Sequence, residues 1–223
     1  MSGEAWPSRL FSGNLYAPRW RETIPVAWAT LPGVTLVAES AGWISLEFRS
    51  QRPLQGEPAG SGDTYRYHAL VRRSGPRFLL ACDAQNAVYE ILRLTGLSAR
   101  VFSPVIDVAR LVRELAATPE FYALGAVFAR VEGYGRSFKS IVMYGSDLAD
   151  ARLFRDVLPR TNPYRASLRG LRTKEDIISV GARGEISFHC RGIQGLLEID
   201  AALRYLSGHQ YVNWSVDSPL EGS

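Results

Sequence analysis

The sequence predicts an α+β protein whose antiparallel sheets are built from hairpin-then-helix (ββα) units, with helices packed on one face. Two observations support this prediction. Pairs of apolar runs flank short glycine-containing turns at three places, and a stretch with helical apolar spacing follows each pair. Runs of strands separated by single helices are typical of antiparallel sheets backed by helices.

The segments before the first unit are expected to be less regular. Residues 1–18 mix Pro, Gly and Ser with aromatic residues, which predicts an irregular aromatic arm packed on the body or on a partner. Interrupted helical turns are expected over Trp20–Leu31. Val34–Glu39 and Trp43–Arg49 predict a hairpin around Ala41-Gly42. Ser50–Asp63, rich in Pro, Gly and Ser, predicts a flexible loop.

Each of the three units consists of two expected strands and one expected helix. In chain order they are Tyr65–Arg72, Arg77–Cys82 and Gln85–Leu94; Leu124–Glu132, Phe138–Tyr144 and Leu148–Leu158; and Ile177–Val180, Glu185–Cys190 and Ile193–Leu206. A further helix is expected over Val105–Ala117. It ends before Pro119, and Thr118-Pro119 is the predicted boundary between subdomains 1–118 and 119–223.

Composition places the chain among ordinary globular proteins and excludes several enzyme classes. With two cysteines in 223 residues we expect a reducing compartment, and with no basic-then-apolar leader or long apolar run we expect a cytoplasmic, non-membrane protein. Neither lysine follows a glycine, so a Walker A loop is absent from the sequence. No metal-ligand spacing or catalytic constellation is found, and no cofactor is expected. A pairing of Cys190 with His68 or His209 stays geometrically open, against the simpler interpretation of a buried strand cysteine.

Positive charge is concentrated in Ala151–Lys174, which holds seven basic residues and one acid, a sum of +6, whereas the whole chain has a net charge of +4. This asymmetry predicts a binding surface. The proposed phosphate contacts are Arg152, Arg155, Arg160, Arg165, Arg169, Arg172 and Lys174, with Arg136 and Lys139 on the preceding hairpin extending the path.

Local structure within this basic stretch is ambiguous. Asn162-Pro163 is typical of a helix start, yet the residues that follow also alternate as in a strand. In either conformation Arg165 and Arg169 lie on one exposed side. That pair does not depend on the choice between helix and strand.

Three interpretations of the basic stretch stay open. Acidic residues within the chain are able to neutralise it, with Glu185, Glu198 and Asp200 as candidates. A nucleic acid or another polyanion is a second solution, with base stacking on Tyr164, Phe154 or Tyr134. An acidic protein surface is the third.

The leading hypothesis is a non-enzymatic nucleic-acid-binding protein that serves as a subunit of a larger assembly. The alternative is a protein–protein adaptor that docks through the aromatic residues of its N-terminal arm, namely Trp6, Phe11, Tyr16 and Trp20. An enzyme of unrecognised type is the third hypothesis. Salt dependence of binding separates a polyanion site from internal ion pairs.

Overall fold

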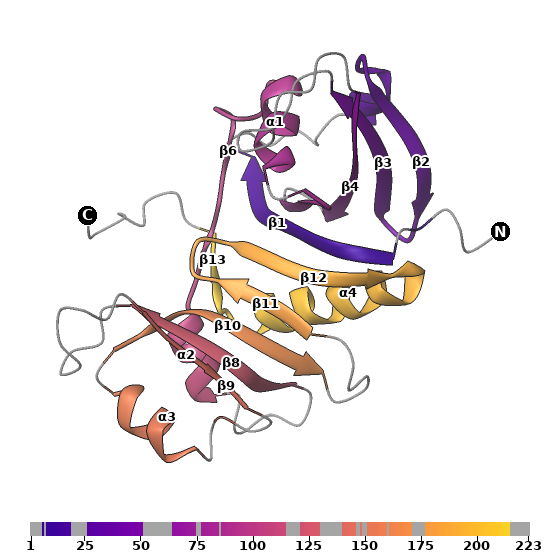
Figure 1. Cartoon of the computed structure of the whole chain (residues 1–223). Coiled ribbons are helices and arrows are strands. Elements are labelled where there is room, and N and C mark those ends of the chain that lie inside the picture. Colours follow the sequence, from indigo (N-terminus) through magenta and orange to yellow (C-terminus); the bar gives the residue numbers. More distant parts are fainter. Residues whose placement is uncertain are drawn as a thin grey trace. The chain divides into compact units, whose positions relative to one another are not determined.

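The structure is a computed structural model that describes residues 6, 8–18, 26–50, 64–74, 77–84, 86–114, 121–129, 140–145, 148, 151–159, 161–170 and 177–214. It combines helices with a large amount of antiparallel sheet, as the sequence predicts (Figure 1). The chain divides into two compact units. The first comprises Met1–Pro104 and His189–Leu197, and the second comprises Val105–Phe188 and Glu198–Ser223.

The first unit is a sheet of five antiparallel strands in the order β2-β3-β4-β5-β1, with β6 paired to β1. Among the described residues of this unit, one 3-10 helix and one α-helix accompany the sheet. The elements are β1 (Ser8–Pro18), η2 (Val26–Thr30), β2 (Val34–Ser40), β3 (Trp43–Ser50), β4 (Tyr65–Ser74), β5 (Arg77–Cys82), α1 (Ala87–Leu94) and β6 (Val101–Phe102).

The hairpin of β2 and β3 confirms the turn predicted at Ala41-Gly42. Both residues have positive φ, 51° and 81°, and Ser40 pairs directly with Trp43 across the turn. Two consecutive positive-φ residues match the right-handed twist of the flanking strands, and glycine adopts this conformation at little cost. The turn chemistry therefore fixes the register of the hairpin.

Residues 8–18 form strand β1 and are not the irregular arm expected from their composition. Phe11 and Leu15 are buried, whereas Ser12 and Asn14 between them are partly exposed, which is the period-two pattern of a strand. The pairing with β5 explains the difference, because β1 satisfies backbone groups on β5 that no local sequence signal reveals. Short-range composition does not predict such a long-range pairing.

Apolar side chains of the strands and of α1 build the core of the first unit. On α1 the buried residues are Ala87, Val88, Ile91 and Leu92, at the spacing of one helix face. They pack with strand residues such as Leu46, Phe48 and Leu80 and with Trp28 of η2 in one buried cluster. The sheet and the helix thus bury their apolar faces against each other.

The second unit contains strands of the antiparallel order β12-β11-β10-β8-β9 and a small second sheet of β7 and β13. Three α-helices accompany them in the part of this unit that the structure describes, and the division between the two units falls within β12 and α4. The elements are β7 (Val105–Ile106), α2 (Val108–Glu114), β8 (Phe121–Ala129), β9 (Ser140–Tyr144), α3 (Arg152–Val157), β10 (Pro163–Gly170), β11 (Ile177–Gly181), β12 (Glu185–Arg191), α4 (Gly192–Gly208) and β13 (Val212–Asn213).

One face of this sheet is apolar and buried. Ala166 and Leu168 on β10 are buried, and their neighbours Val180 and Ile178 on β11 are buried with them. Helix α2 packs against β10. Because alternate strand residues point to opposite faces, the other face of the same strands carries the residues between these positions.

The helix expected over Val105–Ala117 begins later than predicted. Val105–Ile106 is strand β7, because these residues pair with β13. Asp107 then accepts a hydrogen bond through Oδ1 from the backbone N–H of Arg110 at 2.9 Å, which satisfies one of the free donors at the start of α2. Residues 115–117 lie outside the described residues, so the end of this helix is not assigned.

Two further expectations also fall outside the described residues. They are the loop over residues 51–63 and the subdomain boundary at Thr118-Pro119, which stays a prediction. Among the residues that are described, no helix is long and apolar enough to cross a membrane.

Candidate functional site

The second half of the basic stretch is a strand, β10, and not a helix. Its pairing with β8 on one side and β11 on the other decides the conformation that the sequence left open. Arg165, Ser167 and Arg169 alternate with the buried residues Ala166 and Leu168 and are themselves partly exposed. The predicted sharing of one side by Arg165 and Arg169 is therefore confirmed.

A row of three serines crosses this outward face. Ser167 of β10 pairs with Ser179 of β11, which pairs with Ser187 of β12. The hydroxyls of Ser167 and Ser179 are 2.9 Å apart and form a hydrogen bond. Arg165 donates from Nη2 to Oγ of Ser187 at 3.0 Å. Directly opposed residues in antiparallel strands lie on the same face, so these four side chains form one polar surface.

The same register extends the face to the edge strand β9. Tyr144 pairs with Gly125 of β8, and Gly125 pairs with Ser167. Tyr144 therefore lies in the row of the serines, and its side chain is 73% exposed. Val142, 50% exposed, lies in the row of Arg165. The outward face thus combines arginines, hydroxyls and an exposed aromatic ring.

Tyr164 is exposed because β10 is irregular at its start. The pairing with β8 shifts register between Pro163 and Arg165, as in a β-bulge. A bulge inserts one residue and re-aims its side chain. Tyr164 is 45% exposed, although a regular alternation would bury it together with Ala166. Tyr164 directly precedes Arg165 in the sequence.

Among the described residues, neither Arg165 nor Arg169 forms an ion pair with an acidic side chain. The carboxylate of Glu185 accepts a hydrogen bond from the backbone N–H of Arg183 at 2.8 Å, and it covers Gly181, the strand partner of Arg165. Neither arginine forms an ion pair with it.

The remaining acids proposed for neutralisation lie on α4. Glu198 is partly exposed and Asp200 is buried, and both make contacts of their own.

Arg169 differs from Arg165 in one respect: its Nε is buried and makes no hydrogen bond to the described residues. A buried donor without an acceptor is uncommon in folded proteins.

Other predicted contact residues are distributed elsewhere. Arg152 and Arg155 lie on α3 and are exposed, and Arg152 makes a long ion pair of 3.9 Å with Asp156. No hydrogen bond or ion pair among the described residues joins them to the β10 face. The predicted contacts that lie outside the described residues are Arg136, Lys139, Arg160, Arg172 and Lys174.

One of the stacking residues considered from sequence, Phe154, does not lie on this face. Phe154 is 3% exposed and belongs to the buried side of α3. Tyr134 lies outside the described residues. Tyr144, Ser167, Ser179 and Ser187 were not among the site residues predicted from the sequence. In the sequence, Tyr144 stands at the end of a segment predicted to be a strand. The residues that lie beside it across the sheet are known only from the pairing of β9 with β8.

The aromatic residues of the expected arm are largely buried in the structure. Trp6, Phe11 and Tyr16 are between 0% and 6% exposed, and Tyr16 packs against Phe78 with ring centroids 5.4 Å apart. Trp20 lies outside the described residues. These three rings stabilise the chain's own fold and do not present a surface to a partner.

The two cysteines are buried thiols. Sγ of Cys190 donates to the backbone carbonyl of Gly192 at 3.4 Å, and burial raises its pKa to about 11. Burial, with the nearby Asp83 charge, raises the pKa of Cys82 to about 12. Because the thiolate is the nucleophile, both are unreactive near neutral pH. The Cys–His pairing left open by the sequence is not formed among the described residues.

His68 and Asp83 form a polar junction in the first unit. Nδ1 of His68 donates to Oδ2 of Asp83 at 3.0 Å, and the backbone N–H of His68 donates to Oδ1 at 2.9 Å. Nη1 of Arg9 donates to Oδ2 at 2.9 Å. The side chain of Asp83 is only 8% exposed. These bonds link β1, β4 and the end of β5, so their role in this structure is to hold strands together.

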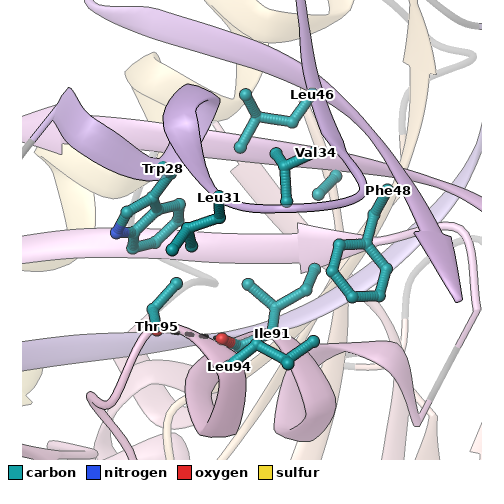
Figure 2. Close-up of a pocket in the computed structure, with 9 residues that line it drawn as sticks. Trp28, Leu31, Val34, Leu46, Phe48, Ile91, Leu94 and Thr95 are labelled. Atoms are coloured by element: carbon teal, nitrogen blue, oxygen red, sulfur yellow. Dashed lines mark hydrogen bonds between the residues drawn. The ribbon is translucent and has the colours of Figure 1, made fainter.

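A pocket in the first unit is lined almost entirely by apolar side chains (Figure 2). They are Trp28, Leu31, Val34, Leu46, Phe48, Ala69, Ile91 and Leu94, with Thr95 at one side. The Thr95 hydroxyl donates to the backbone carbonyl of Ile91 at 2.9 Å. The lining contains no titratable group, and the hydroxyl of Thr95 is already bonded to the backbone of its own helix.

A polar cluster in the second unit joins α2 to the residues after α4. The Tyr211 hydroxyl donates to Oε2 of Glu114 at 2.7 Å, and Nε of Arg110 donates to Oε1 at 2.8 Å. The Arg110 guanidinium also lies over the Tyr211 ring, 5.2 Å from its centroid. Hydrogen bonds from Arg110 and Tyr211 lower the pKa of Glu114 below its usual 4.5. Burial, followed by the bond to Glu114, raises the pKa of Tyr211.

We expect Glu114→Gln to destabilise the protein near neutral pH and to have little effect in acid. Because the folded-state pKa is lowered, the carboxylate stabilises the fold above pH 4.5, and this contribution is lost as the pH falls through the lowered value. Urea unfolding of both proteins from about pH 7 to about pH 3 measures it. Glu114 is 44% exposed, so the effect is small and weakens in salt. A stability difference that stays constant to low pH would contradict the expectation.

No protein-family model matches the chain, and no curated protein matches it. The outward face of the β9-β8-β10-β11-β12 strands, here called the polar face, is the candidate site. Among its described members are Tyr144, Tyr164, Arg165, Ser167, Arg169, Ser179 and Ser187, and the register adds Val142, Ile177 and Glu185 to the same face.

Proposed function

We propose that the protein binds nucleic acid through the polar face. One observation carries the proposal: Arg165 and Arg169 share the outward side of β10 and form no ion pair among the described residues. The register places an exposed tyrosine and a row of hydroxyls on the same face. The guanidinium group of arginine binds phosphate in a bidentate manner, and serine hydroxyls donate hydrogen bonds to phosphate and sugar oxygens.

Hydrogen-bonding capacity also supports this proposal. A guanidinium has five N–H donors, and Arg165 uses one of them among the described residues, for Ser187. That bond orients the guanidinium before a ligand arrives, which lowers the entropy lost on binding.

The basic residues of α3 give the proposal a second, weaker element. Arg152 and Arg155 are exposed and precede β10 in the chain. We propose that they add non-specific attraction for the phosphate backbone, whereas Arg165 and Arg169 position it.

The hairpin-then-helix unit stays a proposal about how the sheets are assembled, supported by the chain order of β4, β5 and α1.

We expect the double substitution Arg165→Ala with Arg169→Ala to weaken binding of a fluorescent single-stranded oligonucleotide at least about tenfold at low salt. Each lost phosphate contact reduces the slope of log affinity against log salt by about 0.7, so the slope should fall by about 1.4. Fluorescence anisotropy between about 50 and 200 mM salt measures both quantities.

A matched control removes the same charge elsewhere. Arg100→Ala with Arg204→Ala takes away one exposed arginine from each unit and leaves the polar face intact. This control should change affinity and slope less than the double substitution on β10. The proposal fails if the unmodified protein does not bind DNA or RNA at low salt, or if both double variants lose the same affinity.

A further inference from the structure

We infer that Tyr144 is a base-stacking residue and that it makes the polar face select single-stranded nucleic acid over duplex and over polyanions without bases. The inference rests on the proposed function and names its ligand class. It concerns a residue outside the basic stretch, which charge patterning alone does not bring into the site.

Exposure is the first observation. Tyr144 is 73% exposed, the largest value among the exposed large hydrophobic residues of the described chain, and its hydroxyl makes no hydrogen bond to the described residues. The preceding residue, Met143, is buried and holds β9 on the core. The ring of Tyr144 therefore contributes little to packing, and it offers a flat aromatic surface to solvent.

Register is the second observation. Tyr144 and Ser167 lie on the same face in one row, separated only by Gly125, which has no side chain. Two strand spacings set the backbones of Tyr144 and Ser167 about 10 Å apart. Arg165 lies two residues before Ser167 on β10, in the neighbouring row of the same face. Arg165 bonds Ser187 of β12 through Nη2, so its guanidinium lies on the β12 side of β10. A phosphate bound to Arg165 and a base stacked on Tyr144 therefore belong to different nucleotides of one strand.

Chemistry then defines the ligand. Stacking on an aromatic side chain needs a base face that is free, and single strands provide it, whereas bases in a duplex are already stacked. Stacking tolerates every base, because each has a π face, so the preference is for strandedness and not for sequence. Inorganic polyphosphate has the charge but no base, and Tyr144 adds nothing to its binding.

The test compares Tyr144→Leu with Tyr144→Phe, using a single-stranded oligonucleotide, a duplex of the same length, and polyphosphate as competitor. Leucine keeps an apolar side chain and removes the ring, whereas phenylalanine keeps the ring. We expect Tyr144→Leu to weaken single-strand binding about 5- to 100-fold, while Tyr144→Phe retains it. The salt slope and the competition by polyphosphate should not change, because no charge is lost.

Tyr89→Leu is the matched control, because Tyr89 is 66% exposed on α1 of the first unit. It should bind like the unmodified protein. Equal single-strand affinity of Tyr144→Leu and unmodified protein would overturn the inference, and so would an equal loss of polyphosphate binding or a preference for duplex. The proposed function survives each of these results if the Arg165 and Arg169 double variant still loses affinity. It fails separately if the unmodified protein binds no nucleic acid.

Discussion

Replacing Gly13 with alanine is expected to unfold the first unit or to destabilise it by at least about 3 kcal/mol, the upper range for overpacking a close-packed interior. An ideal Cβ at position 13 would lie 2.0 Å from the carbonyl oxygen of Leu80 and 2.5 Å from the Cα of Ala81. Both are backbone atoms of β5, so no side-chain rotation relieves the overlap. Strand β1 must move away from β5, and the pairing between Ser12 and Cys82 is lost with it.

Gly208→Ala is the matched control for this substitution. Nothing lies within 4 Å of the Cβ position at Gly208, the last residue of α4. Alanine there should leave stability unchanged or raise it by up to about 1 kcal/mol, because glycine is the weaker helix former. Urea unfolding followed by circular dichroism measures both variants. A Gly13→Ala protein that unfolds at the same urea concentration as the unmodified protein would show that β1 does not pack on β5 in this way.

We expect Asp83→Ala to destabilise the protein by about 2–4 kcal/mol, the second-largest effect. The carboxylate accepts three hydrogen bonds, from the backbone and Nδ1 of His68 and from Arg9, and it is nearly buried. Alanine leaves the His68 backbone N–H without its acceptor, and burying an unsatisfied donor costs free energy beyond the loss of the bond. Urea unfolding at neutral pH measures the loss.

Asp83→Asn separates hydrogen bonding from charge in the same junction. The asparagine carbonyl oxygen is able to accept from the His68 backbone, but the amide has no charge to attract Arg9. We therefore expect a smaller loss than for alanine. If asparagine and alanine cost the same, the charge of Asp83 is the important property. If neither costs stability, Asp83 does not join β1 to β4.

Local signals in the sequence were sufficient for much of the secondary structure. The hairpin at Ala41-Gly42 needs only two positive-φ residues between alternating apolar runs, and β11, β12 and α4 lie within a few residues of their predicted ranges. Signals of this kind depend on neighbours in the chain. They failed at β1 and at β7, where strand conformation is stabilised by partners far away in sequence.

The candidate site was predictable in part for a related reason. Arg165 and Arg169 are four residues apart, so they share a side both in a helix and in a strand, and the pair was identified before the conformation was known. Tyr144 and Ser187 join them only through the pairing of β9, β8, β10, β11 and β12. Composition and charge do not contain that register.

By itself, then, the sequence determined the mixed α and β class, the turn at Ala41-Gly42 and the concentration of arginine after residue 150, because each follows from backbone preferences or from a count of charges. Tertiary structure alone decided that residues 163–170 form a strand, that Glu185 bonds to the backbone of Arg183 and not to Arg165, and that Tyr144 lies on the polar face. The physical reason is that hydrogen bonds between strands, and the burial of one sheet face, are set by residues distant in the chain.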